Sequence, residues 1–463
     1  MSAAIDQLEK TFEIYVDQLK ELAKIPSCSW EGFDPKFVVQ SAEKTAELLK
    51  NAGLENVEIL KVGDAHPYVY ADWLHAGDDK PTVLLYAHHD VQPPMRDELW
   101  KTPAYEPTQV GDRLFGRGVA DDKAGILIHI ASIDCLLKTE KKLPVNVKVI
   151  IEGEEEIGSS HLMDFLSIYK NKMQSDVMIL TDLSNYDTGI PSLTTSLRGL
   201  VTLEVELKTM DHPLHSGMYG GPIPDPVVAL SKIISALVDD NGKVNIPELH
   251  EKVKPVTDLE RKMYKSLNMT KELFRKQATL LPETEILGDN EEILIRMWRE
   301  PSLVINSMES GSRKSAGNVI MDSAWAKIGL RIVPNIDRDF AIEILKKKIL
   351  SLVKWNVTVS FKEDIRGAYW TTDIDHPYFE VAKNALSKGY NAETVFMGSG
   401  GSIPFAGPFS DALGGIPALM VGVEDPYTNA HSENESLHLG DFKKAIKGQI
   451  YLFEGLGKMG KVK

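Results

Sequence analysis

The chain has 463 residues, and at about 150 residues per domain this length predicts two to four domains. Hydrophobic residues make up 43% of the chain and charged residues 26%, which is typical of a globular protein and excludes a disordered or fibrous one. The formal net charge of −15 at pH 7 argues against a general nucleic-acid binder, which needs a basic face.

The first part of the chain predicts helices and strands that alternate. Between residues 5 and 22, apolar side chains recur at steps of three and four, which is typical of a helix buried along one face. A second helix is expected after Asp34-Pro35 and ends near Gly53. Apolar runs predict buried strands at residues 83–86, 145–151 and 177–180, with a helix at 126–137.

The pattern changes near residue 197. Apolar and polar residues alternate from Val201 to Leu207, which predicts a strand with one exposed face. We expect a helix, a strand, a helix and a strand to follow at residues 227–237, 325–332, 340–345 and 357–361. Residues 239–300 are charged and partly helical, so we interpret them as an insertion. After Trp370 the first pattern returns, with a buried strand at 416–423 between two helices.

These elements predict an α/β fold. Its main domain has a mixed, mostly parallel sheet flanked by helices and is built from residues 1–195 and 372–463. An inserted α+β domain spans residues 196–371.

Acidic and histidine residues follow directly after four of the predicted strands. They are His88-His89-Asp90, Glu152-Gly153-Glu154-Glu155-Glu156, Thr181-Asp182, and Glu424-Asp425 with His431 further on. Another pair, Asp121-Asp122, stands between the glycine-rich turn 116–118 and a helix. Because ligands of an open α/β sheet bind outside the carboxyl ends of its strands, we expect these side chains to share one crevice.

Gathered in this way, the carboxylates would repel one another and raise each other's pKa. One or two divalent cations remove that conflict, and a ligand set of nitrogen and oxygen suits zinc or manganese. The two cysteines, Cys28 and Cys135, exclude a disulfide framework and a thiolate zinc cluster. Each of these segments, taken alone, also has an interpretation without a metal. An acidic run is usually a solvated loop, and Asp121-Asp122 could simply begin a helix.

The stretch Gly398-Ser399-Gly400-Gly401-Ser402 predicts a glycine-rich loop. It lacks the Lys-Ser/Thr of a P-loop and the third spaced glycine of a dinucleotide site. We expect its backbone N–H groups to bind a small carboxylate. The Gly-x-Ser-x-Gly turn of a serine hydrolase does not occur in the sequence.

Four motifs together resemble the di-zinc peptidase family of carnosine and cysteinylglycine dipeptidases, aminoacylase and glutamate carboxypeptidase. They are His88–Pro93, Gly116–Lys123, Glu155–Ser159 and Asn429–Glu435. The likeness covers nearly the whole chain and is greatest to the dipeptidase branch. It implies metal-dependent hydrolysis of the peptide bond of dipeptides or short peptides. It also implies two Zn²⁺ per subunit, with Mn²⁺ or Co²⁺ as substitutes.

The resemblance also implies the roles of individual residues. The implied metal ligands are His88, Asp121, Glu156, Asp182 and His431. Asp121 would bridge the two ions, Glu155 would be the general base, and Asp90 would orient His88. Asp122 is expected to follow a cis peptide bond.

In the inserted domain, the resemblance assigns His215 to the active site of the neighbouring subunit in a homodimer. Arg331 would hold the substrate carboxylate, with Asn318 assisting. The loop Gly400-Gly401-Ser402 would bind the same carboxylate. The resemblance therefore makes residues 1–195 and 372–463 the catalytic domain, and 196–371 a lid and dimerisation domain.

Three alternatives remain open. The first is a deacylase that acts on N-acyl or N-succinyl amino acids with the same site. The second is a metal-dependent phosphohydrolase, which the acidic composition disfavours. The third is a binding protein that keeps the fold without activity, which the filled ligand positions disfavour. Gly398-Ser399 replaces a more polar pair before Gly-Gly-Ser-Ile-Pro, so side-chain selectivity also stays open.

The sequence shows no apolar run near the ~18 residues of a membrane helix. Its first residues carry acids and lack the apolar segment of a secretory signal. We therefore expect a cytoplasmic enzyme. Its partners would be its peptide substrate and a second copy of the chain, with no nucleic acid and no membrane.

Overall fold

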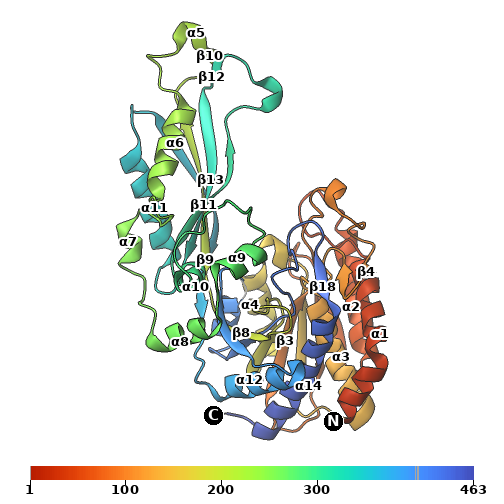
Figure 1. Cartoon of the computed structure of the whole chain (residues 1–463). Coiled ribbons are helices and arrows are strands. Elements are labelled where there is room, and N and C mark those ends of the chain that lie inside the picture. The colour runs from red at the N-terminus through yellow and green to blue at the C-terminus, as the bar shows by residue number, and fades with distance from the viewer. Residues whose placement is uncertain (1, 402, 404–405, 463) are drawn as a thin grey trace. The chain divides into compact units, whose positions relative to one another are not determined.

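The computed structural model describes residues 2–401, 403 and 406–462, which form two compact units (Figure 1). Unit 1 comprises residues 1–195, 372–397 and 404–463, and unit 2 comprises 196–371 and 398–403. Ser402, a predicted carboxylate-binding residue, lies outside the described residues. Each unit has its own hydrophobic core.

The large sheet of unit 1 has the strand order β1-β2-β6-β3-β7-β17-β8. These strands are β1 (Glu55–Leu60), β2 (Tyr68–Trp73), β3 (Thr82–His88), β6 (Asn146–Glu152), β7 (Val177–Leu180), β8 (Ser192–Leu197) and β17 (Ala418–Met420). The pairs β6–β3, β3–β7 and β7–β17 are parallel, whereas β1–β2, β2–β6 and β17–β8 are antiparallel. The predicted mixed α/β sheet is therefore confirmed, with its parallel strands at the centre.

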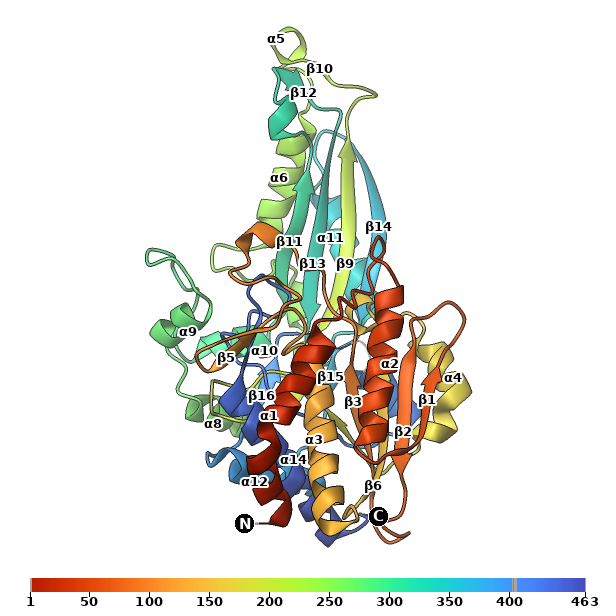
Figure 2. The same cartoon turned by 90° about the vertical axis from the view of Figure 1, so that its right-hand side faces the viewer.

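Both faces of this sheet are covered by helices. Strand β2 shows this directly, because Val69 and Ala71 belong to the main core, whereas the ring of Tyr68 stacks on Phe165 at 4.2 Å on the other face. The helices are α1 (Ala3–Ala23), α2 (Lys36–Asn51), α3 (Lys123–Glu140), α4 (Leu162–Met173), α12 (Pro377–Tyr390), α13 (Ala406–Ala412) and α14 (Leu439–Met459). Figure 2 shows α1, α2 and α3 side by side, and α4 carries Phe165 against the opposite face.

Helix α1 follows the predicted apolar seam. Its seam residues are all buried, namely Ile5, Leu8, Phe12, Tyr15, Leu19 and Leu22. The ring of Phe12 packs against Phe442 of α14, with ring centroids 5.7 Å apart. The seam therefore joins the first helix of the chain to the last.

Strand β17 is shorter than the predicted strand at 416–423. A Cβ atom at Gly422 would lie only 1.3 Å from the carbonyl oxygen of Leu183, so the backbones touch at this point. Beyond β17 an isolated parallel bridge joins Ser184 and Glu424, so the segment after β17 continues beside the segment after β7.

Short elements complete unit 1. Strands β4 (Thr108–Val110), β5 (Arg113–Phe115) and β18 (Ser436–His438) form a small sheet, and β16 (Val395–Ser399) pairs with β8. The 3-10 helices are η1 (Asp97–Leu99) and η2 (Glu155–Ile157).

Unit 2 is built on an antiparallel sheet with the order β11-β13-β9-β14. These strands are β9 (Gly199–Lys208), β11 (Ser302–Glu309), β13 (Ser323–Ile332) and β14 (Thr358–Gly367). In β9, Val201 and Leu203 are buried whereas Glu206 and Lys208 are exposed, as the alternating sequence predicts. Helices α6 (Pro226–Leu237) and α11 (Arg338–Leu352) cover the buried face.

Smaller elements complete unit 2, among them a separate two-stranded sheet. At one end, β10 (Leu214–His215) pairs with β12 (Val319–Ile320) beside α5 (Ser216–Tyr219), as Figure 1 shows. The charged insertion contains α7 (Pro247–His250), α8 (Asp258–Ser266), α9 (Lys271–Gln277) and α10 (Glu292–Trp298). The remaining elements are η3 (Arg313–Ser315) and β15 (Trp370–Thr371).

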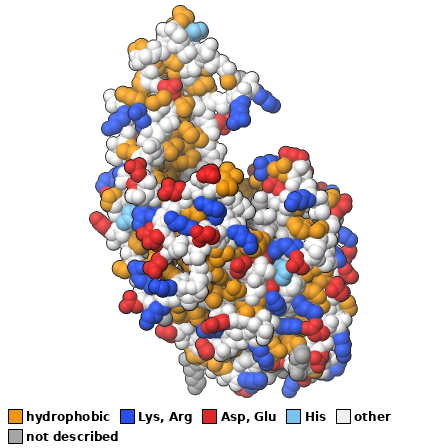
Figure 3. Space-filling model, viewed as in Figure 1, with side chains coloured by type: hydrophobic (Ala, Val, Ile, Leu, Met, Phe, Trp, Pro, Cys, Tyr) orange, Lys and Arg blue, Asp and Glu red, His pale blue; other side chains and the backbone are white. Residues whose placement is uncertain are grey.

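Acidic and basic side chains are interspersed over the face of the molecule drawn in Figure 3, so the net negative charge is not gathered into one patch there. Among the described residues, no helix combines the length and the apolar character that crossing a bilayer requires.

Candidate metal centre

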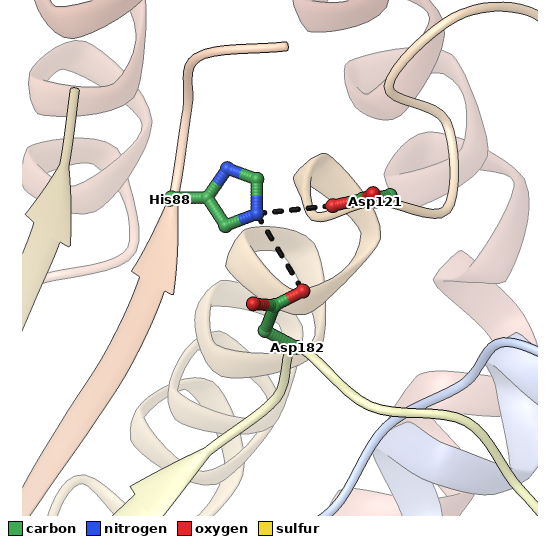
Figure 4. A group of neighbouring side chains, drawn as sticks. All are labelled: His88, Asp121 and Asp182. Atoms are coloured by element: carbon green, nitrogen blue, oxygen red, sulfur yellow. Dashed lines mark hydrogen bonds and ion pairs between the residues drawn. The ribbon is translucent and has the colours of Figure 1, made fainter. Parts of the chain in front are cut away.

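The end of strand β3 holds the first group of candidate ligands. His88 is the last residue of β3, and Asp182 lies just beyond the neighbouring parallel strand β7. The Nε2 atom of His88 lies 3.0 Å from Oδ1 of Asp121 and 3.5 Å from Oδ1 of Asp182 (Figure 4). Their ligand atoms all lie within 4.8 Å of one another.

A second group forms on the other oxygen of Asp121. The Nε2 atom of His431 lies 2.9 Å from Oδ2 of Asp121 and 3.3 Å from Oε2 of Glu156. These three side chains also place their ligand atoms within 4.8 Å of one another. The structure thus brings together all five residues that the family resemblance implies as metal ligands, and Asp121 belongs to both groups.

The charges of this cluster fit divalent cations. Burial, reinforced by the charge of Asp182, raises the pKa of Glu155 well above its usual value. Burial and the charge of Asp121 do the same to the pKa of Glu156. Two imidazoles and three carboxylates suit zinc and similar metals, and a bound cation would remove the repulsion between the acids. The donor set therefore fits the metals that the sequence predicts.

Asp90 ties the two halves of the cluster together. Its carboxylate lies 3.5 Å from Nδ1 of His88 and is fully buried. It also accepts hydrogen bonds from the backbone N–H groups of Glu155 and Glu156, at 3.2 and 3.0 Å. Burial by itself would raise the pKa of Asp90, but the hydrogen bond with His88 outweighs this effect and holds the pKa below its usual value. A single carboxylate thus faces the His88 ring and fixes the turn that carries both glutamates.

Glu435 holds the turn that presents Asp121. Its buried carboxylate accepts hydrogen bonds from Nη1 of Arg117 at 2.7 Å and from the backbone N–H groups of Gly118, Ala120 and Asp121 at 3.0, 3.1 and 3.2 Å. The peptide bond between Asp121 and Asp122 is cis, as the resemblance implies. Glu435 is the last residue of the fourth motif, but its role could not be predicted, because its partners lie more than 300 positions away in the chain.

The predicted residues of unit 2 fall into two separate groups. His215 lies in β10, and the carbonyl of Asn318 accepts the N–H of the next residue, Ser216, at 3.0 Å. Arg331 lies near the other end of β13, eight residues or about 26 Å of strand beyond Ser323. Within unit 2, the structure therefore does not bring His215 and Asn318 together with Arg331.

Gly400 lies beside Arg198, a residue that sequence analysis did not assign to the site. Nε of Arg198 donates to the carbonyl of Gly400 at 3.3 Å, and its Nη1 donates to the hydroxyl of Ser302 at 2.9 Å. Burial, followed by the charge of Arg331, lowers the pKa of Arg198 to about 10. Two arginines thus accompany the loop that contains Gly400 and Gly401. The motif Leu197-Arg198-Gly199 was the available sequence signal.

Comparison with known proteins agrees with the motifs. Residues 84–453 match the model of peptidase family M20/M25/M40. The chain is 31% identical to the Cys-Gly metallodipeptidase DUG1 of Candida albicans, over 96% of this chain and 94% of the relative. It is 28% identical to the Beta-Ala-His dipeptidase of Rattus norvegicus, over 98% and 96% of the two chains.

Solved structures give the same result. The di-peptidase Dug1p from Saccharomyces cerevisiae superposes with a TM-score of 0.87 at 26% identity, covering 99% of this chain and 98% of that one. Human carnosine dipeptidase 1 gives a TM-score of 0.88 at 26% identity and covers 98% of both chains. The family that the four motifs predict is thereby confirmed, and the chain belongs to peptidase family M20/M25/M40.

Proposed function

We propose that this protein is a dipeptidase that hydrolyses the peptide bond of dipeptides or short peptides, with two zinc ions per subunit and Glu155 as general base. The observation that carries the proposal is the pair of ligand groups that share Asp121. Relatives named for Cys-Gly and Beta-Ala-His dipeptides match nearly the full length, which favours a dipeptide over an acylated amino acid.

His88 and Asp182 would hold one ion, Glu156 and His431 the other, and Asp121 both. Bound there, the cations would act as Lewis acids toward a water molecule and the scissile carbonyl. Manganese or cobalt accepts the same donors and could replace zinc.

Glu155 would take a proton from the attacking water and pass one to the leaving amine. Its raised pKa suits a group that must hold a proton for part of the cycle. The hydrogen bond from its backbone N–H to Asp90 fixes the turn on which it stands, so the carboxylate starts from a defined position.

The residues of unit 2 would bind the rest of the substrate. Arg331 and the N–H groups of Gly400 and Gly401 would hold the C-terminal carboxylate, and Arg198 would keep the loop in place. His215 stands at the opposite end of the unit 2 sheet from Arg331. This separation favours a homodimer, in which His215 serves the active site of the neighbouring subunit.

The variant Glu155→Gln tests the general base. We expect it to keep its metal, measured by plasma mass spectrometry, and to lose at least ~100-fold in turnover. Glu393→Gln is the matched control, because the Glu393 side chain is 82% exposed. Turnover close to wild type in Glu155→Gln would contradict the assigned role.

A substrate panel tests the reaction class. Protein reconstituted separately with zinc, manganese or cobalt is assayed on cysteinylglycine and β-alanyl-histidine, and on N-acetyl and N-succinyl amino acids. Hydrolysis of the dipeptides supports the proposal. Hydrolysis of only the acylated amino acids would establish the deacylase alternative instead.

A further inference from the structure

Glu424 is an acidic residue beside the metal centre that the proposed mechanism leaves unused. It follows strand β17 at the same edge of the sheet as Asp182, which follows β7. Among the described residues, neither group of candidate metal ligands includes it. The residue is largely but not completely buried.

The backbone on either side fixes the position of this carboxylate. Glu424 pairs in parallel with Ser184, and its carbonyl accepts the N–H of Asn185 at 2.8 Å. The hydroxyl of Ser184 donates to Oε2 of Glu424 at 2.9 Å. The close approach of Gly422 to Leu183 locks the same two segments together. Glu424 is therefore held beside the segment that carries Asp182 and is not free to turn away.

The surroundings of Glu424 are negative. Burial raises its pKa to about 8, and the charges of Asp121 and Asp182 contribute to the shift. Among the described residues, no lysine or arginine forms an ion pair with Glu424. The carboxylates of Asp121 and Asp182 would be neutralised by the metals that they bind. A third, monovalent cation beside Glu424 would favour the ionised carboxylate, because a nearby opposite charge lowers the pKa of a carboxyl group.

The geometry of a dipeptide supplies such a cation. Its α-amino nitrogen is two bonds from the scissile carbonyl carbon, about 2.5 Å away. When that carbonyl reaches the metals, the ammonium group must therefore lie beside them. An N-acylated amino acid presents a neutral amide there and would leave the carboxylate without a cationic partner.

We propose that Glu424 binds the free amino group of the substrate and thereby selects dipeptides over N-acylated analogues. This inference rests on the proposed dipeptidase function. The residue is a specificity determinant and takes no part in bond cleavage.

The test measures binding without turnover. In the Glu155→Gln background, calorimetry gives the Kd of metal-loaded protein for the α-dipeptide alanylglycine and for its N-acetyl derivative, with and without Glu424→Gln. We expect Glu424→Gln to weaken dipeptide binding by about 10–100-fold, the effect of losing one charge-assisted hydrogen bond. Binding of the acetylated compound should change by less than about 2-fold, because no charge pairs with it. Glu393→Gln in the same background is the control.

The outcomes separate this proposal from the proposed function. Equal weakening of both compounds, or loss of metal from Glu424→Gln, would show that Glu424 supports the metal ligands and would overturn the inference. If Glu424→Gln does not fold, Glu424→Asp shortens the side chain by one methylene group, and weaker binding of the dipeptide alone is then the supporting result, whereas unchanged binding of both compounds would overturn the inference. Wild-type protein that cleaves only acylated amino acids would overturn the proposed function as well.

Discussion

Replacement of Glu435 by alanine gives the most direct test of how the two ends of the chain build the metal centre. The change removes the acceptor for Arg117 and for three backbone N–H groups around Asp121. Burial raises the pKa of Glu435 even beside Arg117, so the ion pair itself adds little net stability. The loss comes instead from leaving a guanidinium group buried without its carboxylate.

The expected magnitude follows from that contact. Breaking a buried ion pair by removing one partner costs about 3–5 kcal/mol, and the orphaned N–H groups keep the value in the upper part of this range. For a domain of this size, roughly 2 °C of melting temperature corresponds to 1 kcal/mol, so Glu435→Ala should lower the Tm by about 8 °C. Metal affinity should fall by about 10–100-fold, because Asp121 loses the group that orients its turn.

The neighbouring Glu433 provides the matched control. Its carboxylate pairs with Arg96 at 2.7 Å, but the Arg96 side chain is 67% exposed. Water can replace this partner, so Glu433→Ala should shift the Tm far less. The assay is thermal denaturation followed by circular dichroism, with and without zinc. Equal shifts for the two variants would refute the reasoning, because the main difference between the two pairs is that Arg96 is exposed whereas Arg117 is buried.

Three further predictions concern other parts of unit 1. Burial raises the pKa of Glu152 from 4.5 to about 7, so the folded protein holds a proton that the unfolded chain releases, and stability falls as pH rises through this window. Glutamine cannot lose a proton, so Glu152→Gln should not show this loss. Urea denaturation should therefore show the free energy of unfolding of Glu152→Gln rising, relative to that of wild type, by about 3 kcal/mol between pH 4.5 and pH 7. Gly422→Ala places a Cβ atom 1.3 Å from the Leu183 carbonyl oxygen and should prevent normal folding, measured as soluble yield and Tm. Gly317→Ala, with nothing within 4 Å, should leave both unchanged. Chelation should lower the Tm and zinc should restore it, by about 2.7 kcal/mol of stability at 100 times the Kd, whereas Asp121→Asn should show a much smaller zinc effect.

Local sequence patterns predict the helices and strands that bury either one face or their whole length. The seam of α1, the run that becomes β3 and the alternation of β9 each reflect a single periodicity. Strand β2 was not predicted, although the aromatic residues Tyr68, Tyr70 and Trp73 favour a strand. The sequence alone could not predict the contact of Gly422 with Leu183 just beyond β17, because that contact joins segments far apart in the chain.

The candidate site divides in the same way. Residues at strand ends, such as His88 and Asp182, could be placed together from the sequence because parallel strands end at one edge. The contacts of Glu435 and Arg198 depend on tertiary structure that no local pattern encodes. The separation of His215 from Arg331 likewise becomes visible only once the strands of unit 2 are paired.

The discontinuity of unit 1 has a consequence for biosynthesis. Its sheet needs β17 and its helical layer needs α14, and both leave the ribosome after all of residues 196–371. Unit 2 can therefore fold while the first part of unit 1 still exposes the apolar edge of β7 that β17 later covers. Partly folded chains of this kind aggregate readily. We expect chaperone dependence during translation, and we expect stop codons even a few turns before the end of α14 to abolish the enzyme.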